Sequence, residues 1–122
     1  MFDEMRIGLL LQRSVSGHEQ FYIARQFVRL ATLDAARALG IDAEVGSLEP
    51  GKRADIIAVD ISHSHQIPTQ HPYSTLVHTA NQENVIFTMV DGEILYDEGS
   101  WSSLDSERVL SRAQEMRTKL RG

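Results

Sequence analysis

Hydrophobic residues recur at helical spacing at the start of the chain. In the segment FDEMRIGLLLQR they form one main stripe, which predicts a helix over residues 2–13. Ile7 and Leu11 lie outside this stripe, and a helix that is apolar on more than one face needs neighbours on more than one face. The stripe consists of Phe2, Met5, Leu9 and Leu10.

A second helical segment follows a polar break at Gly17. The stretch EQFYIARQFVRLATLDAARALG, residues 19–40, again carries apolar residues at helical spacing. We expect Thr32 to divide it into two helices. We expect Gly40 to end the second helix, because glycine readily adopts the left-handed conformation that commonly follows a helix. The apolar positions are Phe21, Ala24, Phe27, Val28, Ala31, Ala35 and Leu39.

The pattern changes to short strands after residue 40. Gly46, Pro50 and Gly51 mark turns, and the run ADIIAVD that follows has the length of a strand. Further on, the runs NVIFTMV and EILYDEG are joined by Asp91 and Gly92, a dipeptide that favours the positive φ angles of a tight hairpin turn. These runs predict a small, mostly antiparallel sheet with a hairpin near its end.

Two more helices are predicted around this sheet. The segment PYSTLVHTA can begin a short helix with Pro72 at its first position, and its inward residues are then Leu76, Val77 and Ala80. The last segment, SSLDSERVLSRAQEMRTKL, is amphipathic, and Ser103 or Asp105 can cap it. We expect its apolar stripe to be buried. That stripe consists of Val109, Ala113, Met116 and Leu120.

The predicted fold class is therefore α+β, with N-terminal helices, a small antiparallel sheet with a C-terminal hairpin, and a C-terminal helix. A chain of 122 residues is long enough for one hydrophobic core. We expect a single domain over residues 1–122, with a helical part at 1–40 and a β-rich part plus the last helix at 41–122.

Composition narrows the classes of partner. The formal net charge is −5, and nucleic acids or anionic membranes need a basic surface, so we expect neither as a partner. Cysteine is absent, which excludes thiolate chemistry and fits a reducing compartment. The acidic start MFDEMR lacks the basic and apolar regions of a signal peptide, so we expect a cytoplasmic protein.

The stretch HSHQIPTQH is the most suggestive chemical feature. It places His63, His65 and His71 within nine residues, and alternate side chains of an extended chain point to the same side. One interpretation is a metal site formed by these three histidines. The other is a solvated polar loop, which we favour because a zinc site needs three or four ligands held rigidly, and Pro68 and polar residues separate the pair from His71.

The other candidate features have structural explanations. EPGKRAD contains Gly51 and Lys52, but it lacks the spacing of a phosphate-binding loop, and no helix opens after it. We interpret His78 as a packing residue among apolar neighbours and His18 as part of a polar turn. Tyr96 and Trp101 are expected to be core or interface aromatics.

The stretch ATLDAARALGIDAEVGSLEPGKRADIIAVD resembles the amidohydrolase superfamily. The matching positions are Ala31, Thr32, Ala35, Ala38, Leu39 and Gly40, followed by residues 46–55. NVIFTMVDGEILYDEG is similar to the closing hairpin of the same family, and MFDEMRIGLLLQR to the helix after the last metal-binding strand. The similar branch is that of aminohydrolases, which includes adenosylhomocysteine and methylthioadenosine deaminases, guanine and cytosine deaminases and triazine chlorohydrolases.

This resemblance implies a C-terminal segment of a metal-dependent enzyme. Such enzymes have a (β/α)8 barrel and a small β-sandwich, and their metal ligands, four histidines and an aspartate, all precede the region that matches here. The resemblance therefore implies that residues 1–40 belong to the end of the barrel and 41–122 to the sandwich. It assigns no catalytic, cofactor-binding or metal-binding residue and no cofactor to this chain.

Two functions remain open at this point. The chain can be a detached, non-catalytic module of an amidohydrolase whose parent hydrolyses carbon–nitrogen bonds other than peptide bonds. Alternatively, it can be a working hydrolase subunit that completes a metal-dependent barrel, or a metal-binding protein that uses its own histidines. We favour the first, with a small-molecule substrate only in the parent enzyme. The exposed helix face and open sheet edges further predict a homodimer.

Overall fold

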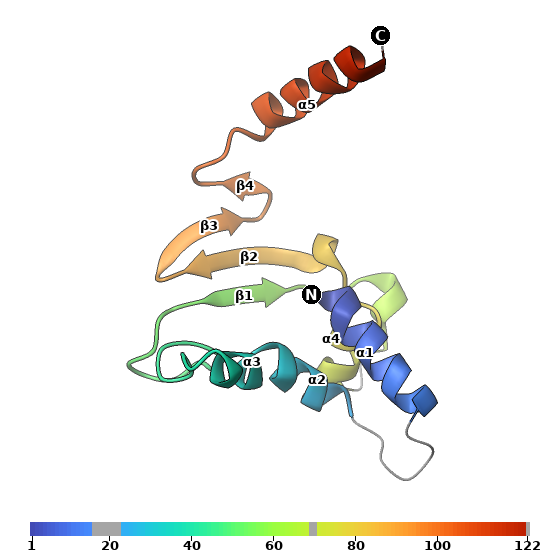
Figure 1. The fold of residues 1–122 in the computed structure, drawn as a ribbon, viewed down its shortest axis with the longest axis vertical. Coiled ribbons are helices and arrows are strands. Elements are labelled where there is room, and N and C mark those ends of the chain that lie inside the picture. The colour runs from blue at the N-terminus through green and yellow to red at the C-terminus, as the bar shows by residue number, and fades with distance from the viewer. Residues whose placement is uncertain (16–22, 69–70, 122) are drawn as a thin grey trace.

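The computed structural model describes residues 1–15, 23–68 and 71–121. The elements follow the predicted order of helices, then a small sheet with one helix inserted, then a final helix, so the α+β prediction is confirmed (Figure 1). The helices are α1 Phe2–Val15, α2 Ala24–Ala31, α3 Leu33–Ala38, α4 Pro72–His78 and α5 Ser106–Arg121. The strands are β1 Ile56–Val59, β2 Val85–Val90, β3 Glu93–Asp97 and β4 Ser100–Trp101.

The buried core lies where α1, α2 and α4 meet. It is a cluster formed by Met5, Leu9, Phe27 and Val77. Gly8 allows α1 and α2 to approach closely, because a Cβ atom at this position would lie 2.9 Å from Cε1 of Phe27. The predicted stripe of α1 is thus only partly right, since Leu10 is 51% exposed and lies outside the core.

Thr32 separates two helices as predicted. Its backbone leaves the helical region at φ −124° and ψ −96°, and its hydroxyl donates a hydrogen bond of 2.8 Å to the carbonyl of Val28. Gly40 follows α3 with φ +72°, the left-handed conformation expected after a helix. In Figure 1 α3 lies beside β1, whereas α2 lies next to α1 and α4.

Helix α4 joins the helical layer to the sheet. Pro72 occupies its first turn as predicted, and Val77 and Ala80 are fully buried, while Leu76 is half-buried. Arg6 of α1 satisfies the end of α4, since its Nη2 donates to the carbonyl of Ala80 at 2.7 Å and its Nε to that of Val77 at 3.3 Å. These bonds use carbonyls that a helix terminus leaves without internal partners.

The sheet is antiparallel throughout, in the order β1-β2-β3-β4. Asp91 and Gly92 form the turn between β2 and β3 with φ +51° and +82°, the signs of the predicted tight hairpin turn, and Val90 pairs with Glu93. In Figure 1 the strands follow one another away from α2 and α3. The described residues form one sheet, so a β-sandwich remains an expectation.

The prediction for the last helix is wrong in one respect. Asp105 caps α5, accepting a hydrogen bond of 3.0 Å from the backbone N–H of Arg108. However, every described side chain of the helix is exposed, so the predicted stripe is not buried by any of the residues that the structure describes. Figure 1 shows α5 standing clear of the rest of the molecule beyond β4. Amphipathic spacing shows which face of a helix is suited to burial, but it does not show that the face is buried within the same chain.

Candidate functional site

The H-x-H pair lies on the irregular segment after β1. A short 3-10 turn, Ser64–Gln66, interrupts the extended chain, so the alternation that would place both imidazoles on one side of a strand does not apply. The ring centroids of His63 and His65 are 5.8 Å apart, with the planes inclined by 40°. Nε2 of His63 lies 3.6 Å from Oδ2 of Asp60, so this imidazole faces a carboxylate.

The three histidines of the metal hypothesis are not brought to one point. His65 and His71 line a pocket of about 330 Å³ together with His78, whereas His63 lies outside it. Within residues 1–15, 23–68 and 71–121, no three His, Asp or Glu side chains are placed to hold a metal ion. The geometry gives the metal hypothesis no support. His18 lies outside the described residues.

Asp60 organises the start of this histidine segment. Its Oδ1 accepts hydrogen bonds from the hydroxyl of Ser62 at 2.6 Å and from the backbone N–H of Ser62 at 2.8 Å. These two bonds, and secondly the nearby His63, lower the pKa of the Asp60 carboxyl. The carboxylate is therefore ionised at neutral pH and acts as the acceptor that shapes a turn.

Two buried amides, which sequence reasoning missed, attach the histidine segment to the rest of the fold. Asn84 is 2% exposed, and its Nδ2 donates to the carbonyl of Asp60 at 3.0 Å and to Oε1 of Gln66 at 3.3 Å. Gln66 in turn donates to Oγ1 of Thr79 at 3.4 Å. The one local signal for this network was the three-residue spacing of Asn81 and Asn84, which is that of a capping box. Oδ1 of Asn84 accepts a hydrogen bond of 2.9 Å from the backbone N–H of Asn81. One wall of the pocket is therefore fixed by structural hydrogen bonds.

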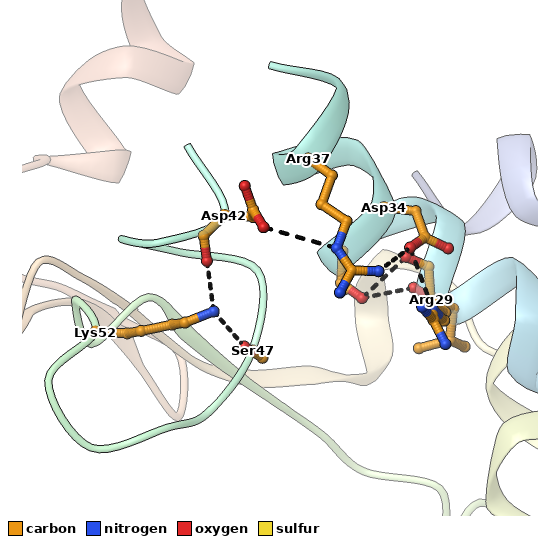
Figure 2. A network of polar contacts seen from close by, with 8 residues as sticks. Arg29, Asp34, Arg37, Asp42, Ser47 and Lys52 are labelled. Atoms are coloured by element: carbon orange, nitrogen blue, oxygen red, sulfur yellow. Dashed lines mark hydrogen bonds and ion pairs between the residues drawn. The ribbon is translucent and has the colours of Figure 1, made fainter. Parts of the chain in front are cut away.

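Lys52 of the GSLEPGK segment is committed to its own loop. Its Nζ donates to the carbonyl of Asp42 at 2.6 Å and to Oγ of Ser47 at 2.7 Å (Figure 2). Ser47 donates to Glu49, and this bond, with the nearby Lys52 charge, lowers the pKa of the Glu49 carboxyl. A lysine held in this way closes a turn, as expected, and is not free to bind a phosphate.

A chain of ion pairs runs along α2 and α3 beside this loop. Oδ1 of Asp34 lies 3.1 Å from Arg29 Nε and 3.2 Å from Arg37 Nη1, and Arg37 Nε lies 3.7 Å from Asp42 (Figure 2). All four side chains are at least about one-third exposed, so each pair contributes on the order of 0–1 kcal/mol. This cluster therefore adds modestly to the stability of the helical layer.

A second pocket adjoins the histidine pocket, and no pattern in the sequence predicted it. It has a volume of about 410 Å³, shares His71, Ser74 and His78 with the first, and adds Arg13 and Arg25. Burial, and then the charges of two arginines, lower the pKa of His78. His78 is half-buried, and its imidazole is neutral at neutral pH, which agrees in part with the expected packing role.

The aromatic pair at the far edge of the sheet is a local contact. The rings of Tyr96 and Trp101 are 4.8 Å apart between centroids, on the paired strands β3 and β4. Trp101 remains 51% exposed. The pair stabilises a sheet edge whose outer side stays open.

Comparison with known proteins identifies the family to which this scaffold belongs. The sequence profile of the amidohydrolase family matches residues 1–95. A 5-methylthioadenosine/S-adenosylhomocysteine deaminase of Symbiobacterium thermophilum is 37% identical over 96% of this chain and 27% of its own length. A 5'-deoxyadenosine deaminase of Methanosarcina acetivorans is 36% identical over 93% of this chain and 26% of its own length.

Solved structures give the same result for the fold. An adenosine deaminase from Xanthomonas campestris with bound zinc superposes with a TM-score of 0.89 and 30% identity, over 99% of this chain and 28% of that one. An atrazine chlorohydrolase from Arthrobacter aurescens in complex with zinc gives a TM-score of 0.83 at 24% identity, over 94% and 26%. The chain thus spans about a quarter of the length of these relatives, and on the match over residues 1–95 it belongs to the amidohydrolase family.

Proposed function

We propose that this chain forms the C-terminal structural part of a metal-dependent amidohydrolase and supplies no metal ligand itself. The parent activity is hydrolysis of a carbon–nitrogen bond in a small molecule, of the deaminase type. The proposal rests on one observation. The alignment with a deaminase relative covers 96% of this chain but only 27% of the relative's length.

The donor set fits this role. Water activation by a metal in a hydrolase requires ligands that hold the ion and leave one position open. The part of the chain that the structure describes offers no such group of His, Asp or Glu. A metal does not fit these residues, so no catalytic step is assigned to them, and their task is to position the elements that contact the rest of the enzyme.

The apolar surfaces support the same role. A groove of about 390 Å³ lies between the start of α1, α2, α4 and β1, and its lining includes Phe2, Val28, Ile57 and Tyr73. The stripe of α5 adds a second exposed apolar surface, where Leu120 is 88% exposed. Surfaces of this kind mark contacts with other polypeptide segments. In a full-length amidohydrolase we expect the preceding part of the fold to cover them.

A chimera tests this proposal. The segment of the Symbiobacterium thermophilum deaminase that aligns with this chain is replaced by residues 1–122, and deamination of methylthioadenosine is measured. We expect activity, because the segment is proposed to supply structure alone. The control is the same enzyme with the segment deleted, which should be inactive. A folded chimera that binds zinc and is no more active than the deletion would contradict the proposal.

A homodimer is the second proposal, for the chain on its own. Residues on the outer faces of α1 remain exposed, among them Ile7, Leu11 and Val15. Burial of apolar area contributes roughly 25 cal/mol per Å², and a symmetric dimer is the commonest way to achieve it. Light scattering should give twice the mass of one chain, reduced to one by Leu11→Glu. A monomer of unchanged mass in both proteins would refute it.

We propose a cytoplasmic location for the parent protein, on the basis of composition. Among the described residues no helix combines the length and apolar character needed to cross a membrane. The absence of cysteine from the whole sequence fits a reducing cytoplasm. Fractionation of cells that express the parent protein is the direct measurement.

A further inference from the structure

The pocket beside α4 collects groups that attract or donate to anions. It has a volume of about 410 Å³ and lies between the end of α1, the start of α2 and the outer side of α4. Two guanidinium groups, Arg13 and Arg25, line it together with the imidazoles of His71 and His78 and the hydroxyl of Ser74. These residues come from three separate parts of the chain, which the fold brings to one point.

No carboxylate is among the described residues that line this pocket. The contrast with the other arginines of the helical layer is clear. Arg6 lies 3.1 Å from Asp3, and Arg29 and Arg37 share Asp34, whereas Arg13 and Arg25 have no ion pair within the described residues. The chain has 17 acidic against 12 basic residues, so a shortage of carboxylates does not explain why these two arginines lack an ion pair among the described residues.

Contacts fix the α2 and α4 sides of the pocket. Cζ of Arg25 lies 6.0 Å from the centroid of the Tyr73 ring, a cation–π distance that keeps the guanidinium beside α4. His78 is half-buried on the last turn of α4, whose end is fixed by the hydrogen bonds of Arg6. Ile23 and Ala24 supply apolar lining at the start of α2.

We propose that this pocket binds an oxyanion, a carboxylate or a phosphate group, between Arg13 and Arg25. Guanidinium groups bind both with paired, charge-assisted hydrogen bonds, and Ser74 and the imidazoles add donors. The volume leaves room for a group attached to the anion. Binding of an oxyanion to the isolated chain does not depend on the parent activity, whereas the second of the two sources named next rests on the proposed function. The oxyanion belongs either to a free small molecule or to an Asp or Glu side chain of the preceding part of an amidohydrolase.

The test is a calorimetric titration of the 122-residue chain with inorganic phosphate and with citrate, at constant ionic strength set by sodium chloride. We expect saturable binding with a Kd of about 1 mM or below for at least one of the two probes. The double variant Arg13→Gln, Arg25→Gln should weaken it at least tenfold. The matched control is Arg29→Gln, in the same layer but paired with Asp34, which should leave the Kd unchanged.

Thermal unfolding gives a second measurement. The better-binding probe should raise the Tm of the unmodified chain by more than it raises the Tm of the double variant, because general exclusion of the salt from the surface acts on both chains and binding to the folded pocket acts on one. Absence of saturable binding by both probes, or equal binding by the double variant, would overturn the proposal. Retained binding in the chimera identifies a free anion as the occupant. Binding to the isolated chain that is lost in a folded chimera identifies a protein carboxylate.

Discussion

Gly46 provides the sharpest test of how the GSLEPGK loop packs. Its φ is +92°, and a Cβ atom there would lie 2.8 Å from Cβ of Ala36 and 3.0 Å from Cα of Leu33. Gly51 has almost the same φ, +93°, but a Cβ atom there would meet nothing within 4 Å. The two glycines therefore share the backbone strain of a substitution and differ in steric crowding.

The expected costs follow from these distances. An alanine at positive φ loses about 1–2 kcal/mol of stability, and this is the whole expected effect of Gly51→Ala. Gly46→Ala adds overpacking against α3, which costs about 1–3 kcal/mol more, because the contacts involve backbone and a short side chain that cannot rotate away. The total for Gly46→Ala is about 2–5 kcal/mol.

Urea denaturation followed by circular dichroism measures both variants. The midpoint of Gly46→Ala should lie clearly below that of Gly51→Ala, with an unchanged m-value in each. Equal midpoints for the two variants would refute the close packing of the loop on α3.

Three further predictions follow from single contacts. Because the pKa of His78 is lowered from 6.5, the unfolded chain binds a proton more readily, so stability should fall as pH decreases through about 6.5; His78→Gln should show a smaller fall in denaturation midpoint between pH 7.5 and 5.5, and an identical fall would contradict this. Gly92→Val forces a β-branched residue to φ +82° and should cost about 1 kcal/mol or more in the urea midpoint, whereas no change would count against the turn. Asn84→Leu leaves the Asn81 N–H without its buried acceptor and should cost about 1–3 kcal/mol, and a neutral result would mean that the amide network is dispensable.

Local patterns predicted the elements well because the signals were local. The hairpin turn at Asp91 and Gly92, the helix break at Thr32 and the proline start of α4 each depend on the conformational preference of one or two residues. Which residues are buried in the core was harder to predict from the sequence. Leu9 and Leu10 occupy neighbouring positions of one predicted stripe, yet only Leu9 is buried, because the positions of α2 and α4 decide which side of α1 is covered.

The geometry of the candidate sites was less predictable from the sequence than the helices and strands were. The histidine spacing was visible, but the 3-10 turn at Ser64–Gln66 that changes its geometry has no strong sequence signature. The pocket of Arg13, Arg25 and His78 had no local signal, because tertiary packing alone brings α1, α2 and α4 together. The spacing of the apolar stripe correctly predicted a helix at α5, but the burial expected for that stripe is not found among the described residues.

Ammonia release by the isolated chain tests the central claim most directly, namely that this part of an amidohydrolase supplies structure and not the metal site. The substrates are adenosine analogues, guanine, cytosine and aminotriazines, each with and without added zinc. We expect ammonia release at the rate of the protein-free control in every case. Zinc-dependent turnover that disappears in the double variant His63→Ala, His65→Ala would contradict it and would establish the histidine segment as a working metal centre.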